Sequence, residues 1–376
     1  MRLATHSQRL ERWLGADEVA RISDSMRDWY GPPIAVARVP GEVLAHRGGD
    51  FRGRIDAGGE ASLLERAVDG MRRLNRRIGR LAERQRRRAV FGTGFASLSD
   101  LIYEATNGKR QELAFQKVGV TGVVAATSTL WYVGNQPAAG ANGAAAPGGT
   151  AMSVATTGAL GFNSPAVSGD TTHFVGGLPV ASVAGNTLLL YDRLFSVTKT
   201  MNSTATEAVS GVPTRYQSTS AGAHNSAEGN FLMVECRTAL PATAHNWTTC
   251  LYTDQSGNTG VTLPSVAGNS SNIQYRLDQP ASQWFCPLAS GDTGVLALTQ
   301  MQCSAAVATG AIDFTIGHPL AWLPCPVANV GLWTDGINSA FNLVRIFDSA
   351  CLAFLEVTKS TTGATTYTGT VTVVSG

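Results

Sequence analysis

Residues 186–200 read NTLLLYDRLFSVTKT, an apolar run with β-branched and aromatic residues that favours an extended strand. Nine further runs of this kind lie between residues 118 and 376, separated by turn-forming residues about every 8–15 positions. They are residues 118–127, 128–134, 172–177, 230–238, 246–254, 294–307, 311–317, 340–359 and 365–376. The pattern predicts a mainly β body over residues 116–376, built as an antiparallel β-sandwich or jelly roll in one or two β subdomains.

One segment of the body has a different composition. Residues 135–149 read NQPAAGANGAAAPGG and offer almost no side chain that could fill a core. Gly- and Ala-rich stretches of this kind behave as flexible linkers. The sequence therefore predicts a flexible loop that cannot pack a core.

The N-terminal part of the chain is helical in pattern and rich in charge. Residues 1–30 carry apolar side chains three and four positions apart, whereas residues 31–59 contain several Gly and Pro, so residues 1–59 are expected to form a helical and extended arm. Residues 60–115 are expected to hold a coiled-coil-like helix followed by a short helix that starts at Ser97 or Ser99 and stops at Asn107-Gly108.

Apolar residues at heptad spacing predict that the helix after Glu60 associates with other copies. About three heptads are marginal on their own, and Gly70 and Gly79 each weaken the helix by about 1 kcal/mol. The seam therefore depends on the rest of the protein. The expected oligomerisation residues are Leu64, Met71, Leu74, Ile78 and Leu81.

The same helix carries a dense arginine cluster. Residues 71–88, MRRLNRRIGRLAERQRRR, contain nine arginines and one acid. Two partners remain open: acidic surfaces of neighbouring subunits, or phosphates of packaged DNA, which guanidinium groups would bind without sequence specificity. The residues expected to meet this anionic partner are Arg72, Arg73, Arg76, Arg77, Arg80, Arg84, Arg86, Arg87 and Arg88.

Charge is divided unevenly along the chain. Residues 1–120 hold 22 of the 29 Lys and Arg and 15 of the 27 acids, a net charge of +7, and the remaining residues have a net charge of −5. Only 15% of all residues are charged, against roughly 25% in soluble domains. A body so poor in charge is expected to be covered by neighbours. No run of about 18 apolar residues predicts a membrane span.

No catalytic or metal-binding motif stands out. The six cysteines show no zinc-type spacing and are expected to be buried free thiols. Ser196 and Lys199 match S-x-x-K, but they are interpreted as strand residues. Two acid and histidine pairs, Asp170 with His173 and Asp313 with His318, could belong to a metal site or a catalytic triad only if the fold brought the necessary side chains together. The segment that starts at Asp254 is interpreted as a hairpin turn. The sequence predicts no cofactor, no metal and no enzymatic activity.

Three sequence segments in the body resemble a known protein family. They are GALGFNSPAVSGDTTHFVGGLPVASVAGNTLLLYDRLFSVTKTMNSTATEAVSGVPTRYQ at residues 158–217, NWTTCLYTDQSGNTGVTLPS at 246–265 and FNLVRIFDSACLAFLEV at 341–357. Over roughly residues 90–376 the chain resembles virion structural proteins of tailed bacteriophages. The resemblance implies a component of the head or neck, present in many copies and without enzymatic activity. The resemblance supplies no residues with assigned roles, and it does not extend to the arginine-rich N-terminal part of the chain.

Two functions from different classes follow. The first is a homo-oligomeric virion structural protein, made in the host cytoplasm, which contacts copies of itself and other virion proteins; capsid shell, capsid decoration, neck and tail positions all stay open. The second is a receptor- or glycan-binding fibre or tail module anchored by its N-terminal helices, with Trp247, Trp284 or Trp333 forming an exposed sugar platform. An enzyme such as a cell-wall hydrolase is the weakest reading.

The coiled-coil interpretation makes a direct prediction. Leu74→Asp places a charge in the apolar seam and is expected to convert the oligomer to a monomer, because a lone buried carboxylate is strongly unfavourable. Light scattering on the purified full-length chain measures the mass. An unchanged mass would remove the coiled-coil interpretation.

Overall fold

The computed structural model describes most of the body and little of the N-terminal part. The described residues are Arg73, Gly79, Gly94, Phe95, 97–120, 126–281, 283–337, 343–358 and 364–376. The chain divides into two compact units, Met1–Gly92 and Thr93–Gly376. Arg73 and Gly79 are helical and exposed. The five seam residues and the other eight arginines of the cluster lie outside the described residues.

The second unit begins with the short helix that the sequence predicts. Helix α5 spans Leu98–Glu104, and the Ser97 side chain caps it by accepting a hydrogen bond from the Asp100 amide at 3.2 Å. A π-helical turn, η1 (Ala105–Lys109), follows and contains Gly108 at φ +86°, a conformation that favours glycine. Strand β1 (Arg110–Val118) then starts, so the expected boundary at residues 115/116 falls inside a strand.

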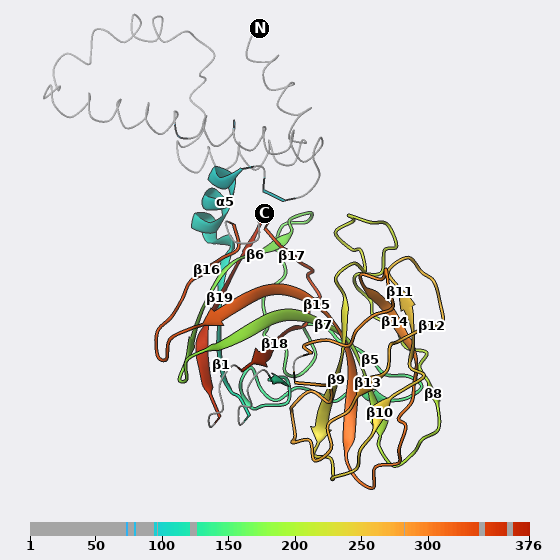
Figure 1. The fold of residues 1–376 in the computed structure, drawn as a ribbon. Coiled ribbons are helices and arrows are strands. Elements are labelled where there is room, and N and C mark those ends of the chain that lie inside the picture. The colour runs from blue at the N-terminus through green and yellow to red at the C-terminus, as the bar shows by residue number, and fades with distance from the viewer. Residues whose placement is uncertain are drawn as a thin grey trace, which may run out of the picture. The chain divides into compact units, whose positions relative to one another are not determined.

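The body is mainly β, with antiparallel sheets (Figure 1). The first sheet has the order β16 (Thr334–Asp335), β6 (Thr172–Ala181), β19 (Thr366–Ser375), β1, β3 (Asn135–Gln136), and β17 (Arg345–Ile346) also pairs with β6. The central sheet has the order β2 (Thr127–Thr129), β18 (Leu352–Val357), β7 (Asn186–Thr200), β15 (Ala311–Cys325), β9 (Phe231–Thr238), and β4 (Ala144–Ala145) and β5 (Thr150–Ala151) also pair with β7. A third sheet has the order β12 (Val261–Thr262), β11 (Leu251–Asp254), β14 (Val295–Met301), β8 (Glu207–Ala208), and β10 (Asn246–Trp247) pairs with β13 (Val266–Ala267).

Strands β7 and β15, each 15 residues long, run through two separate cores. Leu188 and Leu190 of β7 pack in one core with Phe115 of β1 and residues of β19. Further along the same strand, Phe195 and Val197 pack in a second core with side chains of β11 and β14. Figure 1 shows the two long strands side by side between the first sheet and the third. This antiparallel pair of strands therefore joins the two halves of the body.

A β-bulge in β7 decides which side chains face which core. Ile316 pairs with Phe195 and Gly317 pairs with Arg193, so Leu194 is the extra residue. Leu194 and Phe195 both enter the core of the third sheet. The side chain of Arg193, which precedes the bulge, points to the face of the sheet opposite this core. The side chain of Ser196, which follows the bulge, points to that same opposite face. The bulge thus puts Arg193 and Ser196 on one face although they are three residues apart.

The expectation of a flexible loop over residues 135–149 is wrong. β3 lies within it and pairs with β1, and β4 lies within it and pairs with β7. A Cβ at Gly140 would lie 2.1 Å from the Trp131 ring, so glycine lets the backbone pack directly on the indole. The buried Lys117 ammonium donates to the Val133 and Pro137 carbonyls at 2.7 and 2.8 Å, and burial lowers its pKa to about 8.

All six cysteines are free and buried, as expected from the sequence. Burial raises the pKa of each thiol, to about 12 for Cys236 and Cys351. High thiol pKa values keep these groups in the unreactive neutral form. The cysteines therefore serve as small apolar residues of the cores.

One buried hydrogen bond ties the first sheet to the central sheet. The Tyr367 hydroxyl on β19 donates to Oε1 of Glu356 on β18 at 2.7 Å, and both side chains are fully buried. Burial raises the pKa of the Glu356 carboxyl from 4.5 to about 7, against the opposing effect of hydrogen bonds from Tyr367 and the Val120 backbone. The Glu356 carboxyl group therefore binds its proton more tightly in the folded protein than in the unfolded chain.

A pH dependence of stability follows from Glu356. The stabilisation of the folded state by protonated Glu356 is fully present below pH 4.5 and is lost as pH rises toward 7. The reason is that the folded protein must then bury the ionised carboxylate. The loss amounts to about 3 kcal/mol at most. Glu356→Gln is expected to remove this part of the pH dependence, measured by urea denaturation from pH 4.5 to 8. Glu228→Gln, at an exposed position, is the control. Parallel curves for wild type and Glu356→Gln would contradict the assignment.

Candidate functional site

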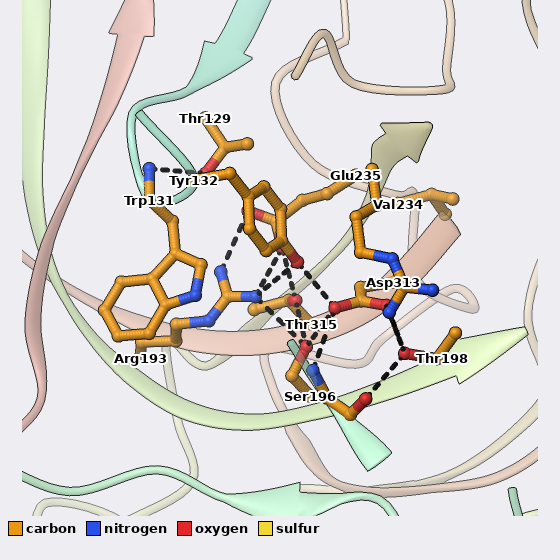
Figure 2. Close-up of polar contacts among 12 residues, drawn as sticks. Thr129, Trp131, Tyr132, Arg193, Ser196, Thr198, Val234, Glu235, Asp313 and Thr315 are labelled. Carbon is orange, nitrogen blue, oxygen red and sulfur yellow. Dashed lines mark hydrogen bonds and ion pairs between the residues drawn. The ribbon is translucent and has the colours of Figure 1, made fainter. Parts of the chain in front are cut away.

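A dense group of polar side chains lies on the face of the central sheet that carries Arg193 and Ser196 (Figure 2). The strand register places them in rows: Glu235, Asp313 and Thr198 are cross-strand neighbours, and so are Thr315 and Ser196. Arg193 follows beyond the bulge, and Tyr132 reaches the group from the segment after β2. We name this group the Arg193 cluster; it comprises Tyr132, Arg193, Ser196, Thr198, Glu235, Asp313 and Thr315.

A fully buried ion pair forms the centre of the cluster. The two terminal nitrogens of Arg193 donate to the two carboxylate oxygens of Glu235 at 2.9 and 2.6 Å. Both side chains have no exposed surface. The guanidinium also lies over the Trp131 ring, 4.8 Å from its centroid. This two-point geometry is the strong form of an Arg–carboxylate contact.

The second carboxylate of the cluster, Asp313, is held by several donors. Its Oδ2 accepts from the Tyr132 hydroxyl at 2.5 Å and from the Gly143 amide at 3.1 Å, and its Oδ1 accepts from the Thr198 hydroxyl at 2.6 Å. Burial, followed by the nearby Glu235 carboxylate, raises the pKa of Tyr132 well above its usual value. Tyr132 is therefore a permanent donor that stabilises a charge in the interior.

The cluster is sealed from solvent, which limits what it can do chemically. Ser196 bonds to Arg193 at 3.0 Å and to Thr315 at 3.0 Å. Lys199 points to the opposite face of β7 and forms an ion pair with Glu207, so it cannot activate Ser196. The interpretation of the S-x-x-K match as strand residues is confirmed. Because its members are buried and bond largely to one another, the cluster supports the fold and presents no nucleophile to a substrate.

Two more buried contacts between ionisable side chains lie elsewhere in the body. Asp192, on the core face of β7, accepts from Arg215 at 2.8 and 2.7 Å and from the Cys351 amide at 2.8 Å. His245 Nε2 lies 2.8 Å from Asp278 Oδ2. Burial lowers the His245 pKa, but the hydrogen bonds to Asp278 and to the Thr243 carbonyl outweigh it and raise the pKa overall. Neither contact could be predicted from the sequence, because the partners are 23 and 33 residues apart and share no motif.

The acid and histidine pairs considered from the sequence are not brought together among the described residues. Asp170 pairs with Lys109 at 2.5 Å, whereas His173 Nδ1 lies 3.1 Å from the Thr171 carbonyl. His318 stacks on Tyr216 and lies 2.9 Å from Asn230. In the part of the chain that the structure describes, no three His, Cys, Asp or Glu side chains form a group that could hold a metal.

The hairpin turn expected at Asp254 is confirmed, because the strands on either side of it, β11 and β12, pair in antiparallel fashion. The Asp254 carboxylate accepts from the Ser256 and Asn258 amides of its own turn at 2.8 and 2.9 Å.

The tryptophans named as a sugar platform differ in exposure. Trp247 is fully buried and donates its indole N–H to Asp278 at 3.0 Å, so its expected surface role is wrong. Trp284 is 38% exposed and Trp333 is 46% exposed.

Trp333 belongs to an apolar surface strip at the edge of the first sheet. The segment 327–333 lies along β6: a Cβ at Gly331 would contact Leu178, and a Cβ at Gly176 would clash with the Trp333 ring. The exposed apolar side chains are Leu178, Val327, Val330, Leu332 and Trp333. We name this surface the 327–333 strip. It holds no charged residue between 327 and 333.

Comparisons with known proteins give little support for any family. No protein family matches the chain, and no curated protein does. Among solved structures, those of infectious bursal disease virus strains Gt and Gx align with it. Both structures are 9% identical in sequence to this chain, and each alignment covers 71% of it. The TM-score is 0.14 for strain Gt, over 81% of that chain, and 0.11 for strain Gx, over 41% of that chain. Such low scores carry no argument about the fold. Among the described residues, no helix has the length and apolar character needed to cross a bilayer.

The buried ion pair makes a stability prediction. Glu235→Leu leaves the Arg193 guanidinium buried without its carboxylate and is expected to lower the free energy of unfolding by about 3–5 kcal/mol. The double change Arg193→Leu with Glu235→Leu removes both charges and is expected to recover most of this loss. Urea denaturation followed by circular dichroism measures both.

The exposed pair Arg110–Glu112 provides the control for this cycle. Glu112→Leu is expected to change the free energy of unfolding by no more than about 1 kcal/mol. If Glu235→Leu were as mild as Glu112→Leu, the buried pair would not have the structural role assigned to it.

Proposed function

We propose that the protein is a non-enzymatic structural component of a bacteriophage virion that assembles as a homo-oligomer on or in the head or neck. Its β-rich body would be a sandwich or jelly roll that packs against neighbouring copies. The N-terminal arginine-rich helix would anchor it, through acidic subunit surfaces or through packaged DNA. Capsid shell, decoration and neck positions are all compatible with this proposal.

The observation that carries the proposal is the inward placement of charge. Seven of the twelve acidic residues after position 120 are buried: Asp170, Asp192, Glu235, Asp254, Asp278, Asp313 and Glu356. Acidic side chains are rarely buried in soluble proteins, because water solvates them better than the interior does. Because these acids are buried, fewer charged side chains lie on the surface than the composition suggests, and such a surface favours contact with other proteins.

The 327–333 strip supplies an apolar surface for such contact. Large apolar side chains that gather on one edge of a soluble body commonly mark an interface. A second copy of the chain is the simplest occupant, because closed assemblies of identical subunits are the commonest oligomers.

The proposal predicts that the strip contributes to assembly. Val330→Glu with Leu332→Glu is expected to lower the oligomeric mass of the full-length chain at micromolar concentration, because two carboxylates would be buried at the interface. Light scattering after gel filtration measures the mass.

A matched control uses Val212→Glu with Val167→Glu, which change residues of similar exposure outside the strip. The control is expected to keep the wild-type mass. A wild-type chain that is a monomer at all concentrations tested would overturn the proposed function, and equal masses for both double variants would remove the strip from it.

A further inference from the structure

Residues 275–278 form an additional strand between the two outer strands of the central sheet, β9 and β2. The Asp278 amide donates to the Val234 carbonyl of β9 at 2.7 Å, and the Leu277 amide donates to the Thr127 carbonyl of β2 at 3.0 Å. Antiparallel bridges join this short strand to both β2 and β9. The central sheet therefore closes on itself through residues 275–278.

The closing strand belongs to a longer covering segment, residues 269–281, which we name the strap. Edge strands expose backbone N–H and C=O groups that pair readily with another extended chain, and proteins avoid such pairing by covering these strands or keeping them short. Within the described part of the chain, the outer strands of the first and third sheets have two residues each, whereas β9 has eight. The strap thus covers a long edge.

The backbone of the strap is strained at two positions. Tyr275 has φ +74° and Ser271 has φ +55°, in the left-handed region that residues other than glycine rarely adopt. Such a conformation persists only where the surrounding contacts hold it. The strap therefore depends on contacts with the rest of the body, and its release would relieve the strain.

Asp278 supplies such a contact. Its Oδ2 accepts from the Trp247 indole at 3.0 Å and lies 2.8 Å from His245 Nε2, and both of these residues lie outside the strap. Its Oδ1 accepts from the Asn269 amide at 2.8 Å and from the Asn272 side chain at 3.2 Å, both within the strap. The Asp278 side chain is fully buried. Because a carboxylate accepts stronger hydrogen bonds than a neutral group does, Asp278 fastens the strap to the segment that contains β10.

We propose that the strap guards the long edge of the central sheet, that Asp278 fastens it, and that its release lets β9 pair with β9 of a second copy of the chain. The Cys236 amide of β9, which donates to the Arg276 carbonyl at 2.9 Å, would then lack its partner. Backbone bonds of this kind supply affinity when an extended strand adds to a sheet edge. An antiparallel contact between two β9 strands is two-fold symmetric, the arrangement most common among identical subunits. This device does not rest on the 327–333 strip or on the proposed function.

Hydrogen exchange of the full-length chain, followed by mass spectrometry, tests the fastening. Asp278→Asn is expected to accelerate exchange at least about tenfold in peptides from β9 and the strap, because a neutral amide replaces the carboxylate that holds the strap. Peptides from β1 and β19 are expected to exchange as in the wild type. A uniform acceleration throughout the body, or no acceleration in the strap, would contradict the proposal.

A milder variant and a matched control accompany this measurement. Asn269→Ala keeps the Asp278 carboxylate but removes side-chain bonds to the Leu277 and Gln279 carbonyls at 3.1 and 2.6 Å, so it is expected to give the same local pattern even if Asp278→Asn does not fold. Asp254→Asn makes the same change at a buried acid that bonds within its own turn. This control is expected to leave exchange in β9 and the strap unchanged.

Light scattering tests the pairing of the released edges. The chains compared all carry Val330→Glu with Leu332→Glu, so that the 327–333 strip does not contribute to the mass. In this background Asp278→Asn and Asn269→Ala are each expected to raise the mass at least about twofold at micromolar concentration, as two-fold pairing does, whereas Asp254→Asn is expected to leave it unchanged. A strap that opens without any rise in mass would overturn the proposed pairing of β9.

Discussion

The body depends on the pairing of charges that have been withdrawn from water. Arg193 with Glu235 and Arg215 with Asp192 are two such pairs, and the carboxylate of each also accepts a hydrogen bond from a distant segment. Without these partners the burial of each ion would cost several kcal/mol. The Arg193–Glu235 pair joins strands β7 and β9, and the Arg215–Asp192 pair joins β7 to the segment after β8.

The same arrangement links the interior to the surface. A chain that is only 15% charged and that still buries many of its acids presents few charges to its surroundings. The 327–333 strip then has little to repel an approaching neighbour.

Sequence patterns predicted the mainly β character of the body, the cap at Ser97, the turn at Asp254 and the buried thiols, because each rests on local chemistry. They failed for residues 135–149, where glycine lets the backbone approach Trp131 closely, an effect that composition alone presents as flexibility. They also missed the bulge at Leu194 and hence the neighbourhood of Arg193 and Ser196. The buried pairs join residues that share no spacing rule, and the seam at Leu74 remains a prediction.

The connections of the Arg193 cluster also bear on how the chain acquires its structure. Tyr132 and Asp313 are 181 residues apart, and Arg110 of β1 pairs with Val374 of β19. Neither contact can form on the ribosome until nearly the whole body has been synthesised. Contacts between such distant residues are associated with folding in milliseconds to seconds. Until these contacts form, the carboxylates that the folded body buries remain hydrated.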